Sequence, residues 1–323
     1  MKRIDGHLHL VQNIAGFNGK GRLNALGNGE AIWDDGTLIQ LLPTTYGESD
    51  FNAENVLRLM DNEKIDKAMV LQGSLNGYQN YYTWQTMRKY PDRFMGAFSA
   101  DPFASEFMTI VRRHVQDLGF RSMKLEISAG GGMHGYHTTT PFRLDTNPQV
   151  GELMHFLANY PGFNVIVDYG SADQVSHQPE AMTNLAARYP QLHFVVCHLS
   201  FGQMDELGLY QNTLDQWAPF PNIYTDLAAI QDINGETSLP YSASRELTRR
   251  ALATLGDKRL IWGTDSPWSA TFNAYHDLAH WLDTSDFMGQ TALENIYYNN
   301  ANRIYFNAEA QAAVAQAVDP VRP

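Results

Sequence analysis

Two histidines close to the N-terminus have the spacing of a metal site. In the stretch IDGHLHL, residues 4–10, apolar residues alternate with His7 and His9, which is the period-two pattern of a β-strand. Residues two apart project from the same face of a strand, so both imidazoles can hold one divalent cation if ligands come from elsewhere. The alternative is an incidental pair of histidines on an ordinary first strand.

A carboxylate near the other end of the chain favours the metal site. The run RLIWGTDSPW, residues 259–268, predicts a strand that ends at Asp265, 256 positions after His9 (265 minus 9). Asp265 would supply the carboxylate that the two histidines lack. The alternative role is a cap on the following helix, which Ser266 and Pro267 would open.

Polar side chains also stand at the ends of other predicted strands. Apolar runs predict strands over 67–71, 93–99, 120–127, 163–168, 192–198 and 222–227. With residues 1–10 and 259–265 this makes eight strands, nearly all followed by a helical segment. The polar residues near their ends are Lys124, Glu126, Asp168, His198 and Asp226.

Strands that alternate with helices pair in parallel, and eight of them predict a closed α/β barrel of the TIM (β/α)8 type. Catalytic groups of such barrels lie at the carboxyl ends of the strands, where these polar residues fall. Residues 1–306 would form a single barrel domain with extra C-terminal helices over 272–282 and 291–306. The tail, 307–323, would pack outside the barrel or fray.

Two glycine-rich segments would lie at the mouth of this barrel. Residues 11–50 are expected to form a long, lid-like loop over the site, from which Lys20 and Arg22 could reach an anionic group of a substrate. The alternative is a solvated loop with incidental charges. The second segment, 128–141, contains His137, which we expect at the rim of the site and in contact with substrate. Trp268 either lines the pocket or packs in the core.

Composition excludes several classes of function. The chain has 323 residues and a net charge of 23 minus 35, or −12, which disfavours binding to nucleic acid or to an acidic membrane surface. No apolar run approaches the ~18 residues that span a bilayer, and no signal peptide is expected. A single cysteine, Cys197, suits a reducing cytoplasm. We therefore expect a cytoplasmic protein with a small-molecule substrate; its aromatic C-terminal helices could form the seam of a homodimer.

The sequence resembles the amidohydrolase superfamily, in the amidohydrolase-related branch that includes aminocarboxymuconate-semialdehyde decarboxylase and pyrone-dicarboxylate lactonase. The resemblance covers residues 1–306. It rests on four motifs: DGHLH at 5–9, FVVCHLS at 194–200, WGTDSPW at 262–268 and YYNNANRIYF at 297–306.

The resemblance implies metal ligands at His7, His9 and Asp265, with Asp265 also as base. His198 would be a further ligand or an acid/base beside the metal. The departure from the family is Asp168, at a position where the family usually has a metal-binding histidine. Asp168 would be a ligand of zinc, or of manganese, because a carboxylate shifts preference toward the harder ion. The alternatives are a weakened metal site and a carboxylate that only caps the following turn.

Two reactions use the same residues. In a hydrolase, Asp265 takes a proton from the attacking water and His198 stabilises the oxyanion of a small, anionic cyclic ester or amide, such as a lactone. In a decarboxylase, a protonated Asp265 or His198 protonates the ring carbon before carbon dioxide leaves. Lys124 and Glu126 would contact substrate in both cases, or else form a salt-bridged pair in the barrel. A barrel that binds a ligand without catalysis, or serves as a regulatory subunit, is a different class.

Overall fold

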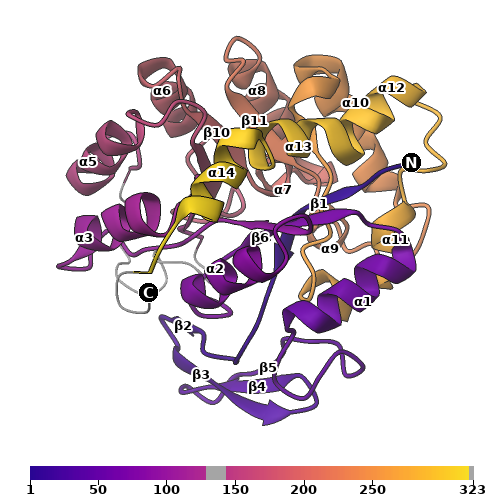
Figure 1. The fold of residues 1–323 in the computed structure, drawn as a ribbon. Coiled ribbons are helices and arrows are strands. Elements are labelled where there is room, and N and C mark those ends of the chain that lie inside the picture. The colour runs from indigo at the N-terminus through magenta and orange to yellow at the C-terminus, as the bar shows by residue number, and fades with distance from the viewer. Residues whose placement is uncertain (129–142, 320–323) are drawn as a thin grey trace.

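Parallel strands form the centre of the molecule in a computed structural model that describes residues 1–128 and 143–319. In this part of the chain the strands pair in the orders β1-β6-β7 and β12-β11-β10-β9-β8, and all neighbours are parallel (Figure 1). Two isolated parallel bridges, Leu8 with Ser266 and Phe98 with Met123, join the two groups and close the barrel. The strands are β1 (Ile4–His9), β6 (Lys67–Leu71), β7 (Phe94–Gly96), β8 (Ser122–Glu126), β9 (Asn164–Asp168), β10 (His193–Val196), β11 (Ile223–Asp226) and β12 (Leu260–Ile261).

The predicted α/β class with parallel strands is confirmed. All eight strands lie inside the predicted apolar runs, and β6 has the predicted limits. Most strands are fully buried because helices cover their outer side, so polar residues are hidden as completely as apolar ones. The last strand is shorter than predicted: β12 ends at Ile261, and Asp265 has a φ of 55°, in the left-handed region, which ends the extended backbone.

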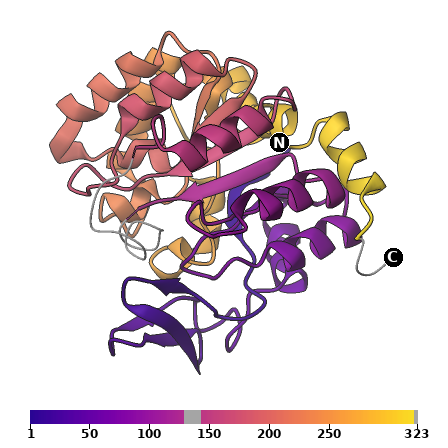
Figure 2. The same ribbon diagram turned by 90° about the vertical axis from the view of Figure 1, so that its left-hand side faces the viewer.

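Helices follow most of the barrel strands and form the outer layer (Figure 2). One that no pattern in the sequence predicted, α8, lies between β10 and β11. No helix of the described residues is both long enough and apolar enough to cross a membrane. The longer helices are α1 (Ala53–Glu63), α2 (Asn80–Lys89), α3 (Phe107–Arg112) with its π-helical extension η1 (Arg113–Asp117), α5 (Pro148–Leu157), α6 (Pro179–Arg188), α8 (Leu207–Trp217), α10 (Ser242–Leu255), α11 (Tyr275–His280), α12 (Gln290–Glu294), α13 (Asn300–Tyr305) and α14 (Ala308–Gln316).

The tail after residue 306 is helical. In α14, Ala310 and Val314 are buried. Arg88 of α2 donates to the carbonyl oxygen of Val314 at 3.3 Å and also bonds the carbonyl of Ala317, next to the helix end. These contacts attach α14 to the outer layer of the barrel.

The prediction that residues 11–50 form a long, lid-like loop is wrong. Residues 17–40 form a four-stranded antiparallel sheet, β2 (Phe17–Asn18), β3 (Gly21–Gly27), β4 (Glu30–Trp33) and β5 (Leu38–Gln40), which projects from one end of the barrel (Figures 1 and 2). The sequence signal for it is Asn28-Gly29: both residues have positive φ, 50° and 75°, as a tight hairpin turn between β3 and β4 requires. Leu23 pairs with Trp33, and both are buried.

Candidate active site

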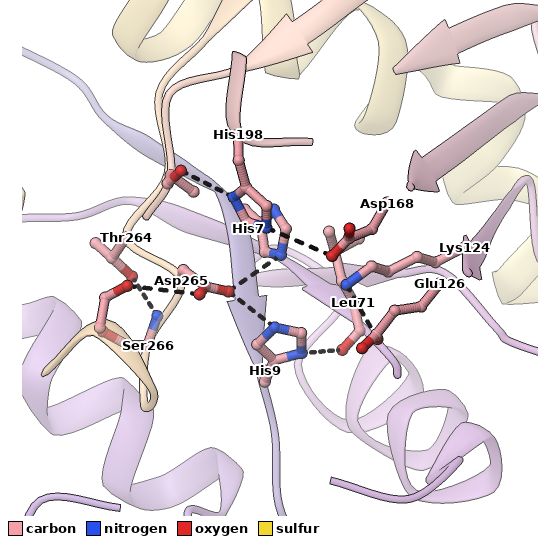
Figure 3. Close-up of polar contacts among 12 residues, drawn as sticks. His7, His9, Leu71, Lys124, Glu126, Asp168, His198, Thr264, Asp265 and Ser266 are labelled. Carbon is pink, nitrogen blue, oxygen red and sulfur yellow. Dashed lines mark hydrogen bonds and ion pairs between the residues drawn. The ribbon is translucent and has the colours of Figure 1, made fainter. Parts of the chain in front are cut away.

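Three predicted metal ligands converge at the carboxyl end of the barrel. His7 and His9 come from β1, and Asp265 follows β12, the neighbouring strand. The Nε2 atoms of His7 and His9 lie 3.2 and 3.0 Å from Oδ1 of Asp265, and all three side chains are buried (Figure 3). Their ligand atoms lie within 4.8 Å of one another. Residues from the two ends of the chain therefore meet at one point.

The other nitrogen of each imidazole is already engaged. Nδ1 of His9 lies 3.0 Å from the carbonyl oxygen of Leu71, and Nδ1 of His7 lies 3.0 Å from Oδ2 of Asp226. A carbonyl oxygen only accepts, so Nδ1 of His9 carries the proton. Burial raises the pKa of Asp226, against which the charge of His198 and the backbone N–H groups of His198 and Ala228 favour the ionised form. An ionised Asp226 likewise only accepts, so it takes the proton of Nδ1 of His7 in a hydrogen bond. Burial holds the pKa of His7 well below its usual value, so this ring is neutral.

Nε2 of His7 is then left with a lone pair that points at Asp265, and Nε2 of His9 lies at hydrogen-bond distance from the same carboxylate. Nε2 of His7 has no hydrogen-bond partner among the described residues. A lone pair on His7 and an ionised carboxylate cannot lie this close without a positive charge between them, and either a proton or a metal ion can supply it. A divalent ion of the zinc class takes imidazole and carboxylate ligands, as His7, His9 and Asp265 would provide. The other ring nitrogen of a histidine ligand usually donates to a carboxylate or a carbonyl oxygen, as those of His7 and His9 do here. The residues present therefore fit a metal ion.

Hydrogen bonds from the first strand hold Asp265 in place. Its backbone N–H donates to the carbonyl oxygen of His7 at 2.8 Å. The buried carboxylate of Asp5 accepts from the N–H and the hydroxyl of Thr264 at 2.9 and 2.6 Å. Burial by itself would raise the pKa of Asp265, but the hydrogen bond to His9 and the nearby charged ring of His198 outweigh it and lower this pKa to about 2. Asp265 is thus ionised at neutral pH.

His198 stands on an unusual backbone turn. The segment α7 (His198–Phe201) has φ values of 59°, 48°, 58° and 56°, so all four residues are left-handed. Such a conformation costs non-glycine residues roughly 1–2 kcal/mol each. Side chains from two neighbouring strands stabilise it: Asp226 accepts from the N–H of His198 at 2.8 Å, and the hydroxyls of Tyr169 and Ser200 share a short hydrogen bond.

This turn places the His198 ring over the predicted metal ligands. The ring stacks on His7 with centroids 4.8 Å apart, and its Nδ1 donates to the carbonyl oxygen of Ala228 at 2.8 Å. Nε2 faces Oδ2 of Asp168 at 3.7 Å, an ion-pair distance. Burial lowers the pKa of His198, but the carboxylates of Asp168, Asp226 and Asp265 outweigh it and raise this pKa to about 9. His198 is therefore a proton donor at neutral pH.

Lys124 and Glu126 of β8 form a buried pair in the same cavity, with 3.4 Å between Nζ and Oε2. Burial lowers the pKa of Lys124, but Glu126 and the other acidic neighbours outweigh it, so the lysine stays charged. Burial raises the pKa of Glu126. Gly73 makes room for this pair, because a Cβ there would lie 1.6 Å from Oε2 of Glu126.

A cavity of about 280 Å³ opens above these groups. Trp268 lines it, as predicted, and so do two polar residues that the sequence analysis did not single out, Asn76 and Asp232. Lys20 and Arg22 do not line it: both are exposed, and Arg22 borders a separate hollow together with Asp34. Neither is brought to the site, because the β2–β3 hairpin that carries them pairs with β4 instead of folding inward. His137 lies outside the described residues.

Two further acidic residues, Asp168 and Asp226, lie near His198. Asp168 lines the cavity, but its carboxylate faces His198 and is not part of the His7–His9–Asp265 group, so a ligand role for it stays a prediction. In the sequence, Asp226 is marked only by its place at the end of a predicted strand. The structure shows that it bonds both His7 and His198.

Comparison with known proteins is consistent with this geometry. Residues 4–306 match the amidohydrolase family. Protein fluG of Emericella nidulans is 24% identical over 141 residues, which are 39% of this chain and 15% of that protein, so the chain spans far less than two thirds of that relative.

Three solved structures share the fold. A probable 2-pyrone-4,6-dicarboxylic acid hydrolase from Acinetobacter baumannii is 14% identical, with a TM-score of 0.66 over 95% of this chain and 100% of that one. An amidohydrolase from Burkholderia multivorans with bound zinc is also 14% identical, with a TM-score of 0.62 over 95% and 99%. A 2,6-dihydroxybenzoate decarboxylase is 16% identical, with a TM-score of 0.57 over 78% and 87%.

Proposed function

Because this chain belongs to the amidohydrolase family, an enzyme family that generally uses a divalent metal ion, we propose that it is a metal-dependent hydrolase of a small, carboxylated cyclic ester or amide, such as a lactone. The observation that carries this proposal is the ionised Asp265, which lies against Nε2 of both His7 and His9 and lines the cavity. A general base must be ionised and within reach of water, and Asp265 meets both conditions.

His7, His9 and Asp265 would hold the ion. A bound divalent ion, zinc in the first place, would polarise the substrate carbonyl and lower the pKa of a water toward ~7. Asp265 would accept a proton from the attacking water as the water oxygen forms its bond to the carbonyl carbon. The same carboxyl then passes the proton to the leaving oxygen or nitrogen as the ring bond breaks. His198, protonated through its acidic neighbours, donates to the oxygen that gains negative charge.

A carboxylated substrate is favoured by the buried cation in the cavity. Lys124 is charged and nearly inaccessible, at 2% exposure, and it lines the cavity together with Glu126. A substrate carboxylate that reached Lys124 would gain a charge-assisted hydrogen bond in a water-poor site. The size of the cavity suits a single small ring.

The second candidate is a non-oxidative decarboxylase of a small aromatic or unsaturated acid. It is favoured by the pKa of about 9 at His198, which keeps a proton available for a ring carbon, and by the fold shared with 2,6-dihydroxybenzoate decarboxylase. Asp265 would have to be protonated to act as the donor, whereas its low pKa favours the base of a hydrolase.

The test is a panel of small carboxylated rings, lactones and aromatic acids among them, assayed in parallel for ring opening and for carbon dioxide release. We expect ring opening with the wild type and a loss of at least ~10²-fold in kcat with Asp265→Asn. Carbon dioxide release without ring opening would overturn the hydrolase in favour of the decarboxylase. Ligand binding without turnover, unchanged in Asp265→Asn, would point to a non-catalytic barrel.

A further inference from the structure

A second group of potential metal ligands lies on the outside of the barrel. Glu63 is the last residue of α1, and His276 and His280 are one turn apart on α11, the helix beside it (Figure 1). Nδ1 of His276 lies 2.8 Å from Oε2 of Glu63, and Nε2 of His280 lies 3.0 Å from the same oxygen. The two rings are 4.7 Å apart. Two imidazole nitrogens and one carboxylate oxygen thus lie within 4.8 Å of one another.

A second carboxylate orients one of these rings. Nδ1 of His280 lies 2.8 Å from Oδ2 of Asp283, and Nη2 of Arg3 holds both oxygens of Asp283 at 2.6 and 2.7 Å. Both nitrogens of His280 therefore face carboxylate oxygens. A neutral ring has one proton, so one of these two contacts needs either a second proton or a metal ion.

We propose that Glu63, His276 and His280 form a peripheral binding site for a divalent ion of the zinc class, separate from the active site. Two histidines one helical turn apart with a carboxylate give three zinc ligands, and the Asp283–His280 bond is the outer carboxylate–histidine contact usual at such ions. Ligands of a tetrahedral zinc ion are about 3.3 Å apart, since each lies ~2.0–2.1 Å from it. The two distances from these nitrogens to Oε2 of Glu63, 2.8 and 3.0 Å, need to increase by only a few tenths of an ångström.

The role of this site is structural. The side chain of His276 is 67% exposed, so the fourth position faces solvent rather than a substrate cavity. The ion would connect α1 with α11, and α11 follows the segment that carries Asp265 and Trp268. Binding would therefore stabilise the folded chain and restrict the movement of the segment next to the active site.

The experiment counts the ions on the full-length protein. Chelator-stripped wild type, His276→Ala and His155→Ala are titrated with Zn²⁺ by calorimetry, and metal content is measured after gel filtration. His155 is an exposed histidine on α5 and is the matched control. We expect the wild type and His155→Ala to bind one equivalent more than His276→Ala does. Saturating Zn²⁺ should raise Tm by ~2–5 °C more in the wild type than in His276→Ala.

A second variant separates ligation from an ordinary ion pair. Asp283→Asn keeps all three ligands but removes the carboxylate behind His280, so the affinity of the peripheral site should fall by ~10–100-fold without loss of the equivalent at high Zn²⁺. Equal zinc stoichiometry in the wild type and His276→Ala would overturn the proposal. One equivalent in the wild type and none in His276→Ala would support the peripheral site and count against a metal at His7, His9 and Asp265.

Discussion

Asp226 shows how a residue that does not line the cavity can influence the chemistry of the site. Its Oδ2 accepts from Nδ1 of His7 at 3.0 Å, and its Oδ1 accepts from the backbone N–H of His198 at 2.8 Å. This buried carboxylate thus fixes the tautomer of the His7 ring and the backbone conformation at His198. Because Nδ1 of His7 carries its proton toward Asp226, Nε2 is free to bind a cation.

Asp226→Asn is expected to weaken the metal site while the fold is kept. The amide NH2 would donate to Nδ1 of His7 and move the ring proton to Nε2, the atom that must bind the cation. We expect metal affinity and kcat to fall by ~10–100-fold or more, as measured by zinc titration and turnover. The control is Asp173→Asn, an exposed carboxylate in the loop after β9. Unchanged zinc affinity in Asp226→Asn would contradict the assigned tautomer.

At the scale of elements, helix α1 shows how local signals set the ends of a helix. Asn52 caps its first turn by accepting from the N–H of Asn55 at 3.0 Å. Lys64 ends it in the left-handed region, with φ 57° and ψ 41°, and its N–H lies against the carbonyls of Asp61 and Met60. Glycine is the usual residue at this position, because a Cβ makes the left-handed conformation costly.

Lys64→Gly should therefore stabilise the protein by ~0.5–1 kcal/mol, measured as the free energy of unfolding in urea. Lys64→Ala is the control: it removes the same side chain but keeps the Cβ, so it should leave the free energy of unfolding near that of the wild type. A gain of equal size in both variants would assign the effect to the lysine side chain instead of the backbone.

At the scale of the whole molecule, stability toward acid depends on groups that folding buries in the neutral form. His114 lies on the π-helical segment η1, where its ring stacks on Phe98 at 4.8 Å and its Nδ1 donates to the carbonyl of Ile110 at 2.8 Å. Burial lowers the pKa of His114 below its usual 6.5. His114 therefore binds a proton less readily in the folded protein than in the unfolded chain.

His114→Phe should reduce the loss of free energy of unfolding as the pH falls below 6.5. Above pH 6.5 the ring is neutral in both states, and its contribution is fully present. As the pH falls through 6.5 the unfolded chain takes up the proton first, so the wild type loses up to about 1.4 kcal/mol per pH unit that the variant does not lose. Urea unfolding at pH 7.5, 6.5 and 5.5 measures this difference. A difference between the two proteins that stays constant with pH would contradict the neutral buried ring.

The sequence by itself determined the α/β class, the strand positions and the convergence of His7, His9 and Asp265. Each strand is an apolar run bounded by polar residues, which is a local signal, and parallel strands bring their carboxyl ends to one rim whatever their distance along the chain. The same local reading missed the hairpin at Asn28-Gly29, although its turn signal was visible.

Only the tertiary structure decided which polar groups touch. The bond from Asp226 to His7, the left-handed turn under His198 and the position of Lys20 and Arg22 away from the cavity depend on how neighbouring strands pack side by side. The convergence of Glu63 with His276 and His280 depends on two helices that lie more than 200 residues apart in the sequence. Hydrogen bonds and ion pairs act over a few ångströms, whereas sequence patterns report burial and backbone conformation; the contacts exist only once the barrel has closed.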